Sequence, residues 1–137
     1  MTQVWRVNFG TQAGTVLELH ASAHGRVTLA FGPPGLLDRC LARPLKQLTP
    51  ETICTRAALE RSIAQARSNG WATAPNQVLH GVNGLAAPIF NHASAYAGAI
   101  AIAGSIQYIP AAPSKAQIEP VMEAARRISR KLGWRAK

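Results

Sequence analysis

"VNGLAAPIF", residues 82–90, and "AYAGAIAIAG", residues 95–104, are two apolar stretches joined by the four residues "NHAS". Each stretch has the length and composition of a strand, and the short polar connection is typical of a hairpin turn. The pair therefore predicts an antiparallel β-hairpin. Alanine and glycine dominate both stretches, which leaves room above the sheet. Such a face either packs tightly on a helix or forms the floor of a cavity.

Three other stretches are strand candidates. "WATA", residues 71–74, precedes the hairpin, while "QVWRVN", residues 3–8, and "TVLEL", residues 15–19, lie near the start of the chain. The stretch at 3–8 alternates weakly between apolar and polar residues, as a half-buried strand does.

Three helices are expected before the hairpin. One runs from Ser22, a plausible N-cap, to Phe31, and "GPPGLLDRCLARP" predicts a second, short helix that stops at Pro44. Thr55 opens the clearest helix, "TRAALERSIAQARSNG", in which Asn69–Gly70 supplies a left-handed cap at the end. Helices combined with an antiparallel hairpin predict an α+β fold.

The chain ends with a basic helix, which begins at Ser114. Pro120 is expected to kink this helix or to move its start nearer to residue 119. Fifteen Lys and Arg against six Asp and Glu give the chain a net charge of +9. Such an excess suggests an acidic partner, although a solvated helix face is the simpler interpretation of a terminal cluster. The cluster includes Arg126, Arg127, Arg130 and Lys131.

The bulk composition is that of one packed domain. At 137 residues, with 47% apolar and 15% charged residues, the chain is long enough for a single core. No secretion signal and no apolar run of membrane-spanning length are evident, so a soluble, cytoplasmic protein is expected. Cys40 and Cys54 do not form a CxxC pair, and two reduced thiols are the simplest expectation.

His20 and His24 stand four residues apart in "HASAH" and raise the question of a metal site. If Ser22 caps the helix, His20 lies outside it, so the two rings do not share a helix face. No third ligand is evident nearby. We therefore expect no metal and no cofactor.

Several segments resemble the effector-binding domain of the IclR-type transcriptional regulators. They are "LHASAHGRVTLAF", "LLDRCLARPLKQLTPETI", "LERSIAQARSNGWA", and "GVNGLAAPIFN" with "YAGAIAIAGS", within Val16 to Gly133. The resemblance implies a GAF-like or profilin-like domain, in which a curved antiparallel sheet is flanked by helices. It also implies a pocket for a small organic acid or aromatic metabolite, and assembly into a homodimer or homotetramer. Operator DNA would be bound through an N-terminal winged helix-turn-helix.

The resemblance also implies where a ligand would bind. The backbone N–H groups of Ser22, Ala23 and His24 would lie at a helix N-terminus, a natural position for a carboxylate. The positions that commonly carry polar pocket side chains in the family are occupied here by Ala74, Gly84, Ala101 and Ala103.

Hydrogen bonding to a ligand is then left to the backbone and to Asn76, His80 or Asn83. Because an unpaired buried polar group costs about 1–3 kcal/mol, an aromatic or hydrophobic acid is expected rather than a small hydroxy acid. The alternative is a pocket that has lost sensing.

The chain departs from the family at its start. The winged helix-turn-helix and the first part of the effector domain are not matched, so residues 1–137 are expected to be one shortened domain with no DNA-binding domain. A missing strand would leave a bare sheet edge, which favours pairing with a partner.

Two other functions remain open from the sequence. Direct nucleic-acid binding would use the basic terminal helix, although an aromatic-interleaved surface is lacking. An enzyme is not expected, because no nucleophile elbow, phosphate loop or paired carboxylates are found. Acid–base chemistry in the pocket segments would depend on His24 or His80 alone.

Overall fold

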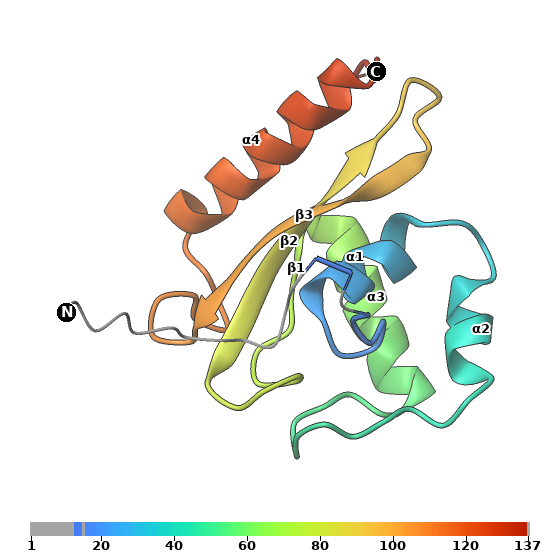
Figure 1. Cartoon of the computed structure of the whole chain (residues 1–137), viewed down its shortest axis with the longest axis vertical. Helices are drawn as coiled ribbons and strands as arrows, with labels where there is room; N and C mark the ends of the chain where they lie inside the picture. The colour runs from blue at the N-terminus through green and yellow to red at the C-terminus, as the bar shows by residue number, and fades with distance from the viewer. Residues whose placement is uncertain (1–12, 15, 137) are drawn as a thin grey trace.

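The computed structural model describes residues 13–14 and 16–136 of the chain (Figure 1). The predicted strand at residues 3–8 lies outside them. The elements in chain order are α1 (Ala23–Phe31), α2 (Leu36–Leu41), α3 (Arg56–Asn69), β1 (Ala72–Thr73), β2 (Val82–Phe90), β3 (Tyr96–Ser105) and α4 (Lys115–Lys131).

The predicted hairpin is confirmed. The three strands form one antiparallel sheet in the order β1-β2-β3, with Gly84 opposite Ala103 and Ala86 opposite Ala101. In the turn, the Asn91 backbone N–H donates to the Ala95 carbonyl at 2.9 Å. Ala95 belongs to this turn, so β3 begins and ends one residue later than the pattern predicted. Among the described residues, the outer edge of β3 has no partner strand.

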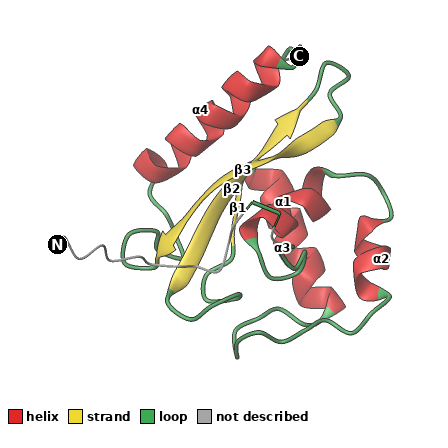
Figure 2. Ribbon diagram, in the orientation of Figure 1, coloured by secondary structure: helices red, strands yellow, loops and turns green. Residues whose placement is uncertain are grey.

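The sheet separates two layers of helices (Figures 1 and 2). On one face, α1 packs on β2 and α3 packs on α1, in a buried cluster that includes Val27, Leu59, Ile63 and Ala86. On the other face, Leu85 and Ala87 pack on Val121 and Ala125 of α4 together with Ile109. Successive residues of β2 thus face opposite helix layers, as the strand period requires. The expected α+β fold, an antiparallel sheet with flanking helices, is confirmed.

Capping side chains fix where two of the helices begin. The Ser22 Oγ accepts a hydrogen bond from the Gly25 N–H at 2.9 Å, and the Thr55 Oγ1 accepts one from the Ala58 N–H at 3.3 Å. Gly70 ends α3 with a left-handed φ of 79°. These are the N-caps and the glycine cap that the sequence predicted.

The expected strand at residues 15–19 is wrong for the residues that the structure describes. Residues 16–18 have no regular structure, and residue 15 lies outside the description. The Glu18 carbonyl accepts hydrogen bonds from the N–H groups of Ala21 and Ser22, both at 3.2 Å. The chain is therefore already turning toward α1 at Glu18, which excludes an extended pairing there.

Of the two effects expected of Pro120, a kink or a start nearer residue 119, the later start is wrong, because α4 begins at Lys115. The Gln117 Oε1 accepts a hydrogen bond from the Ser114 N–H at 2.9 Å, which fixes the first turn. Pro120 removes one backbone donor from the next turn, and the apolar stripe that packs on the sheet holds the helix together around it. None of the described helices is both long and apolar enough to span a membrane.

Candidate ligand-binding site

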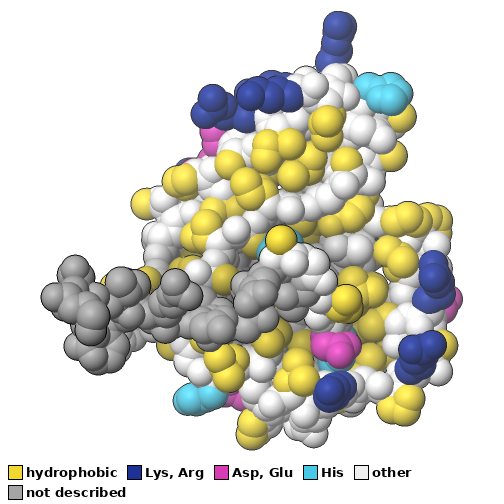
Figure 3. All heavy atoms as spheres, in the orientation of Figure 1, with side chains coloured by type: hydrophobic (Ala, Val, Ile, Leu, Met, Phe, Trp, Pro, Cys, Tyr) yellow, Lys and Arg dark blue, Asp and Glu magenta, His cyan; other side chains and the backbone are white. Residues whose placement is uncertain are grey.

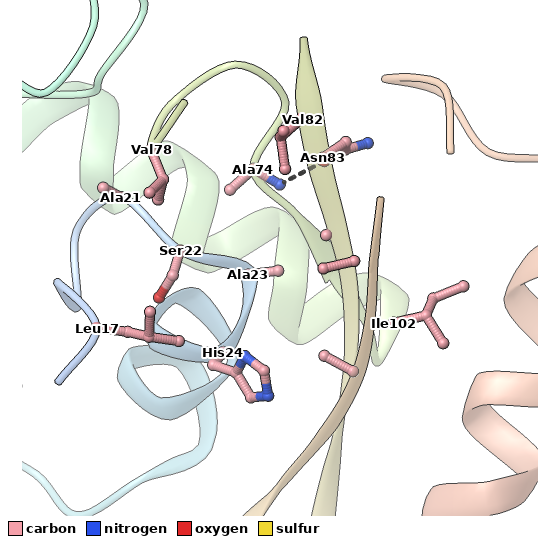
Figure 4. A pocket seen from close by; sticks show the side chains of 13 residues that line it. Leu17, Ala21, Ser22, Ala23, His24, Ala74, Val78, Val82, Asn83 and Ile102 are labelled. Atoms are coloured by element: carbon pink, nitrogen blue, oxygen red, sulfur yellow. Dashed lines mark hydrogen bonds between the residues drawn. The ribbon is translucent and has the colours of Figure 1, made fainter. Parts of the chain in front are cut away.

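A cavity of about 270 Å³ lies between the N-terminus of α1 and the β2–β3 hairpin (Figure 4). Apolar side chains of Leu17, Val78 and Val82 contribute to its lining. The structure brings all eight of the predicted ligand-binding residues together around it: Ser22, Ala23, His24, Ala74, Asn83, Gly84, Ala101 and Ala103.

Small residues in the hairpin make this cavity possible. Gly84 lies opposite Ala103 and Ala86 lies opposite Ala101, so the four positions share one face of the sheet. That face meets the first turn of α1, where a Cβ atom on residue 84 would lie 3.2 Å from the Ala23 Cβ. The absence of bulky side chains here lets α1 approach while leaving an open space beside it.

The start of α1 offers two backbone donors to the cavity. The first turn of a helix leaves its N–H groups without helical acceptors, and those of Ala23 and His24 have no acceptor among the described residues. The Ser22 N–H was also expected to be open to a ligand, but it donates to the Glu18 carbonyl at 3.2 Å. The Ser22 hydroxyl is also committed, since it caps Gly25 and donates to the Glu18 carbonyl at 3.0 Å. Ser22 therefore shapes the site, and Ala23 and His24 supply the open donors.

Asn83 is held by the protein itself. Its Oδ1 accepts from the Ala74 N–H at 3.1 Å (Figure 4), and its Nδ2 donates to the carbonyls of Ile109 at 3.0 Å and Pro110 at 3.1 Å. The side chain is 1% exposed. Both amide hydrogens are thus used, and Asn83 ties β2 to the segments on either side of it.

Asn76 and His80, the other predicted polar groups, do not line the cavity. The Asn76 Oδ1 accepts from the Gly81 N–H at 2.7 Å, and His80 is exposed. Both residues lie in the loop before β2, so they are close to the lining residues in sequence but do not contribute to the lining.

His24 is the titratable side chain of the cavity lining, which contains no Asp, Glu, Lys or Arg. The ring is half-buried, and desolvation lowers the pKa of His24 below its ordinary value of 6.5. The ring is therefore neutral at neutral pH, with one nitrogen as donor and the other as acceptor. It can bond a ligand oxygen without adding a full charge to an apolar site.

The apolar wall was missed by sequence reasoning. Val82 lies on the same face of β2 as Gly84 and Ala86, because alternate residues of a strand share a face. Strand periodicity could therefore have identified it. Leu17 and Val78 lie in irregular segments with no local signal. Ile102 also borders the cavity, but its side chain points away from α1 (Figure 4).

The two histidines of "HASAH" have separate environments. His20 is buried, and its Nε2–H donates to the Lys46 carbonyl at 2.7 Å, whereas His24 borders the cavity. Within residues 13–14 and 16–136, no group of three or more His, Cys, Asp or Glu side chains is placed to hold a metal ion.

The basic helix is partly neutralised along its own surface. Arg126 pairs with Glu123 at 3.1 Å and with Glu119 at 3.6 Å, and Arg130 pairs with Glu123 at 3.5 Å. Arg127 and Lys131 have no ion pair among the described residues. Figure 3 shows Lys and Arg side chains gathered along the outer edge of α4, which is the arrangement of a solvated helix face.

Comparisons with known proteins agree on one family. The protein-family model described as "Bacterial transcriptional regulator IclR C-terminal" matches residues 2–130 of this chain. The HTH-type transcriptional regulator BhcR of Paracoccus denitrificans is 35% identical over 117 residues, which are 85% of this chain and 42% of that protein. The glycerol operon regulatory protein of Streptomyces griseus is 31% identical over 124 residues, or 89% of this chain and 48% of that protein. Both relatives are regulators by name.

The fold comparison agrees with the sequence comparisons. The crystal structure of a putative IclR transcriptional regulator from Silicibacter sp. TM1040 matches with a TM-score of 0.77 at 31% identity, covering 88% of this chain and 48% of that one. The chain thus spans about half the length of the relatives that it matches. A family model that covers most of the chain, together with this shared fold, shows that the chain belongs to the IclR C-terminal family of bacterial transcriptional regulators.

Proposed function

We propose that the cavity beside α1 binds the carboxylate of a small aromatic or hydrophobic organic acid, and that this binding controls how a regulator holds its operator DNA. The observation that carries the proposal is the cavity itself, an apolar space that ends at the open N–H groups of Ala23 and His24. Family membership supports the regulatory part. The DNA contact, the homodimer or homotetramer and the cytoplasmic location are part of the same proposal.

The volume favours a ligand with a single ring. Drug-sized ligands occupy pockets of about 300–1,000 Å³, and an apolar cavity of about 150 Å³ already holds benzene. The cavity here, about 270 Å³, is larger than the one that holds benzene and slightly smaller than a typical pocket for a drug-sized ligand. One aromatic ring with a short carboxylate arm therefore fits the available room.

The chemistry of the lining favours an apolar acid. A carboxylate can accept hydrogen bonds from the Ala23 and His24 N–H groups and is stabilised by the positive end of the helix dipole. The alanines and Gly84 offer the rest of the ligand no polar side chain. A hydroxyl buried against them would lose its hydrogen bonds with water without replacement.

The test compares benzoate and phenylacetate with glycolate by isothermal titration calorimetry on the intact protein. We expect the aromatic acids to bind and glycolate to bind at least about tenfold more weakly, a difference of roughly 1.4 kcal/mol. Ala103→Leu narrows the cavity and should weaken binding, while Ala97→Leu, at an exposed β3 position outside the lining, should not. Equal binding of glycolate, or equal effects of the two leucine variants, would contradict the proposal. No binding of any acid would indicate a pocket that has lost sensing.

Nucleic-acid binding by α4 is the second candidate, because Arg127 and Lys131 are exposed and have no ion pair among the described residues. If it holds, the affinity for DNA falls steeply with salt, and Arg127→Gln with Lys131→Gln removes most of that slope. Binding that is absent or indifferent to salt rules it out.

A further inference from the structure

A second cavity, of about 630 Å³, lies beside α3. It is bordered by Arg26 of α1, by Arg61 and Ser62 of α3, and by Thr73 and Gln77 around β1. It shares no lining residue with the cavity beside the hairpin, and its lining contains no Asp or Glu. The two cavities therefore differ in chemistry: the first is apolar, whereas the second is polar and cationic.

Arg26 is the unusual residue of this cavity, because its side chain is only 1% exposed. Its Nη2 donates to the His20 carbonyl at 2.8 Å and to the Gln77 Oε1 at 2.9 Å, and its Nη1 donates to the Ser62 hydroxyl. Its Nε has no hydrogen-bond partner among the described residues. Every acceptor around this guanidinium is neutral.

The chain contains no carboxylate side chain that could balance the Arg26 charge. All six Asp and Glu residues lie among the described residues, and none of the ion pairs they form includes Arg26. Desolvation lowers the pKa of Arg26 to about 10, so the group is still charged at neutral pH. A buried charge without a counter-charge is costly, and proteins normally pair it.

Arg61 adds a second positive charge at the mouth of the same cavity. It is exposed and, like Arg26, takes part in no ion pair with the six carboxylates. Hydroxyl and amide groups stand beside the two arginines, and such groups can complete the hydrogen bonding of an anion.

We propose that this cavity is an anion site, which takes a small oxyanion, a phosphate or carboxylate group, between Arg61 and the buried Arg26. Arg61 meets the anion directly by charge-assisted hydrogen bonds. Arg26, which is buried in the wall of the cavity, contributes its uncompensated charge through a medium that screens it weakly. The site is separate from the one proposed for the aromatic acid and does not depend on it.

Gln77→Glu is the decisive variant. Glutamate has nearly the shape of glutamine, so the substitution places a carboxylate oxygen where the Gln77 Oε1 now accepts from Arg26. The buried charge is then balanced from within the chain. We expect a higher melting temperature without added anion, and the loss of the response to phosphate.

The experiment titrates inorganic phosphate, and separately acetate, into the intact protein at constant ionic strength set with sodium chloride, following melting temperature and calorimetric heat. At least one of the two oxyanions should raise the melting temperature of the wild type more than chloride does. The oxyanion that does so shows whether the site takes a phosphate or a carboxylate group. Arg61→Gln should weaken this binding about tenfold, the loss expected for a charge-assisted hydrogen bond. Arg39→Gln, which removes one exposed charge outside this cavity, should leave it unchanged.

The proposal is overturned if neither oxyanion stabilises the wild type more than chloride does. It is also overturned if Arg61→Gln responds as the wild type does. Because Arg61 is exposed, its variant keeps the test decisive even if Gln77→Glu fails to fold.

Discussion

Gly84 and Ala23 pack so closely that a Cβ atom on residue 84 would stand 3.2 Å from the Ala23 Cβ. This contact joins the hairpin to the first turn of α1 at the edge of the proposed ligand cavity. A contact at that distance is tighter than ordinary van der Waals packing, so a methyl group there must displace one of the two segments.

Gly84→Ala is therefore expected to lower stability by about 1–2 kcal/mol through overpacking, and to weaken binding of an aromatic acid because the cavity narrows. Gly104→Ala is the matched control, since its Cβ would meet the Ile109 Cδ1 at an ordinary 3.6 Å. Thermal melts and calorimetric titration of both variants check this. A Gly84→Ala protein with unchanged stability would mean that α1 can shift away freely.

Ser22→Ala removes the cap of α1 and is expected to cost about 1 kcal/mol of stability. Thr55→Ala removes the corresponding cap of α3, whose hydrogen bond is longer, so its loss should be smaller. The two variants differ in ligand binding, because only α1 presents its first turn to the cavity. Denaturant unfolding measures the stabilities, and titration with the acid should show weaker binding for Ser22→Ala alone.

Asn83→Ala leaves the Ala74 N–H and the Ile109 and Pro110 carbonyls without their side-chain partner. Each unsatisfied buried group costs about 1–3 kcal/mol, so a total loss of about 3 kcal/mol or more is expected. Asn91→Ala, in the exposed hairpin turn, should cost clearly less. If Asn83→Ala instead loses ligand affinity while keeping its stability, Asn83 is a ligand contact and not a structural tie.

His24 links stability to pH. Burial lowers its pKa in the folded protein below the unfolded value of 6.5, so below that value the unfolded chain binds a proton more readily than the folded one. Stability is therefore lost as the pH falls through 6.5 toward the folded pKa, and is unaffected by this group above it. His24→Asn should flatten this part of the profile in thermal melts from neutral to mildly acidic pH. Ala97→Leu, at an exposed β3 position with no titratable side chain, should leave the slope unchanged.

Local patterns in the sequence explain why much of the fold could be predicted. The bounds of β2 match the apolar stretch at residues 82–90, because a polar turn and a glycine loop delimit it on either side. Ser22, Thr55 and Gly70 marked helix ends because capping is a contact between residues three or four apart. The helix start near residue 119 was a wrong expectation from Pro120. A proline in the second turn removes only one hydrogen-bond donor, and the packing of α4 on the sheet outweighs that loss.

Features that depend on distant contacts could not be predicted. Asn83 was expected to face a ligand, yet its amide is bonded to residues 26 and 27 positions away in the chain. Nothing near Arg26 in the sequence indicates that α3 and Gln77 enclose it. The strand expected at residues 15–19 failed for a different, local reason, because the Glu18 carbonyl accepts from the N–H groups of Ala21 and Ser22 and turns the chain toward α1.

The cavity beside α1 has one wall from residues 17–24 and the other from residues 74–103. Whatever enters it touches two parts of the chain that are far apart in sequence and therefore acts as a noncovalent cross-link. Its binding energy would oppose local separation of α1 from the hairpin. Backbone amides of α1 would then exchange with deuterium more slowly when the cavity is filled. The rigidity of the contact between α1 and the hairpin would thus report whether a ligand is bound.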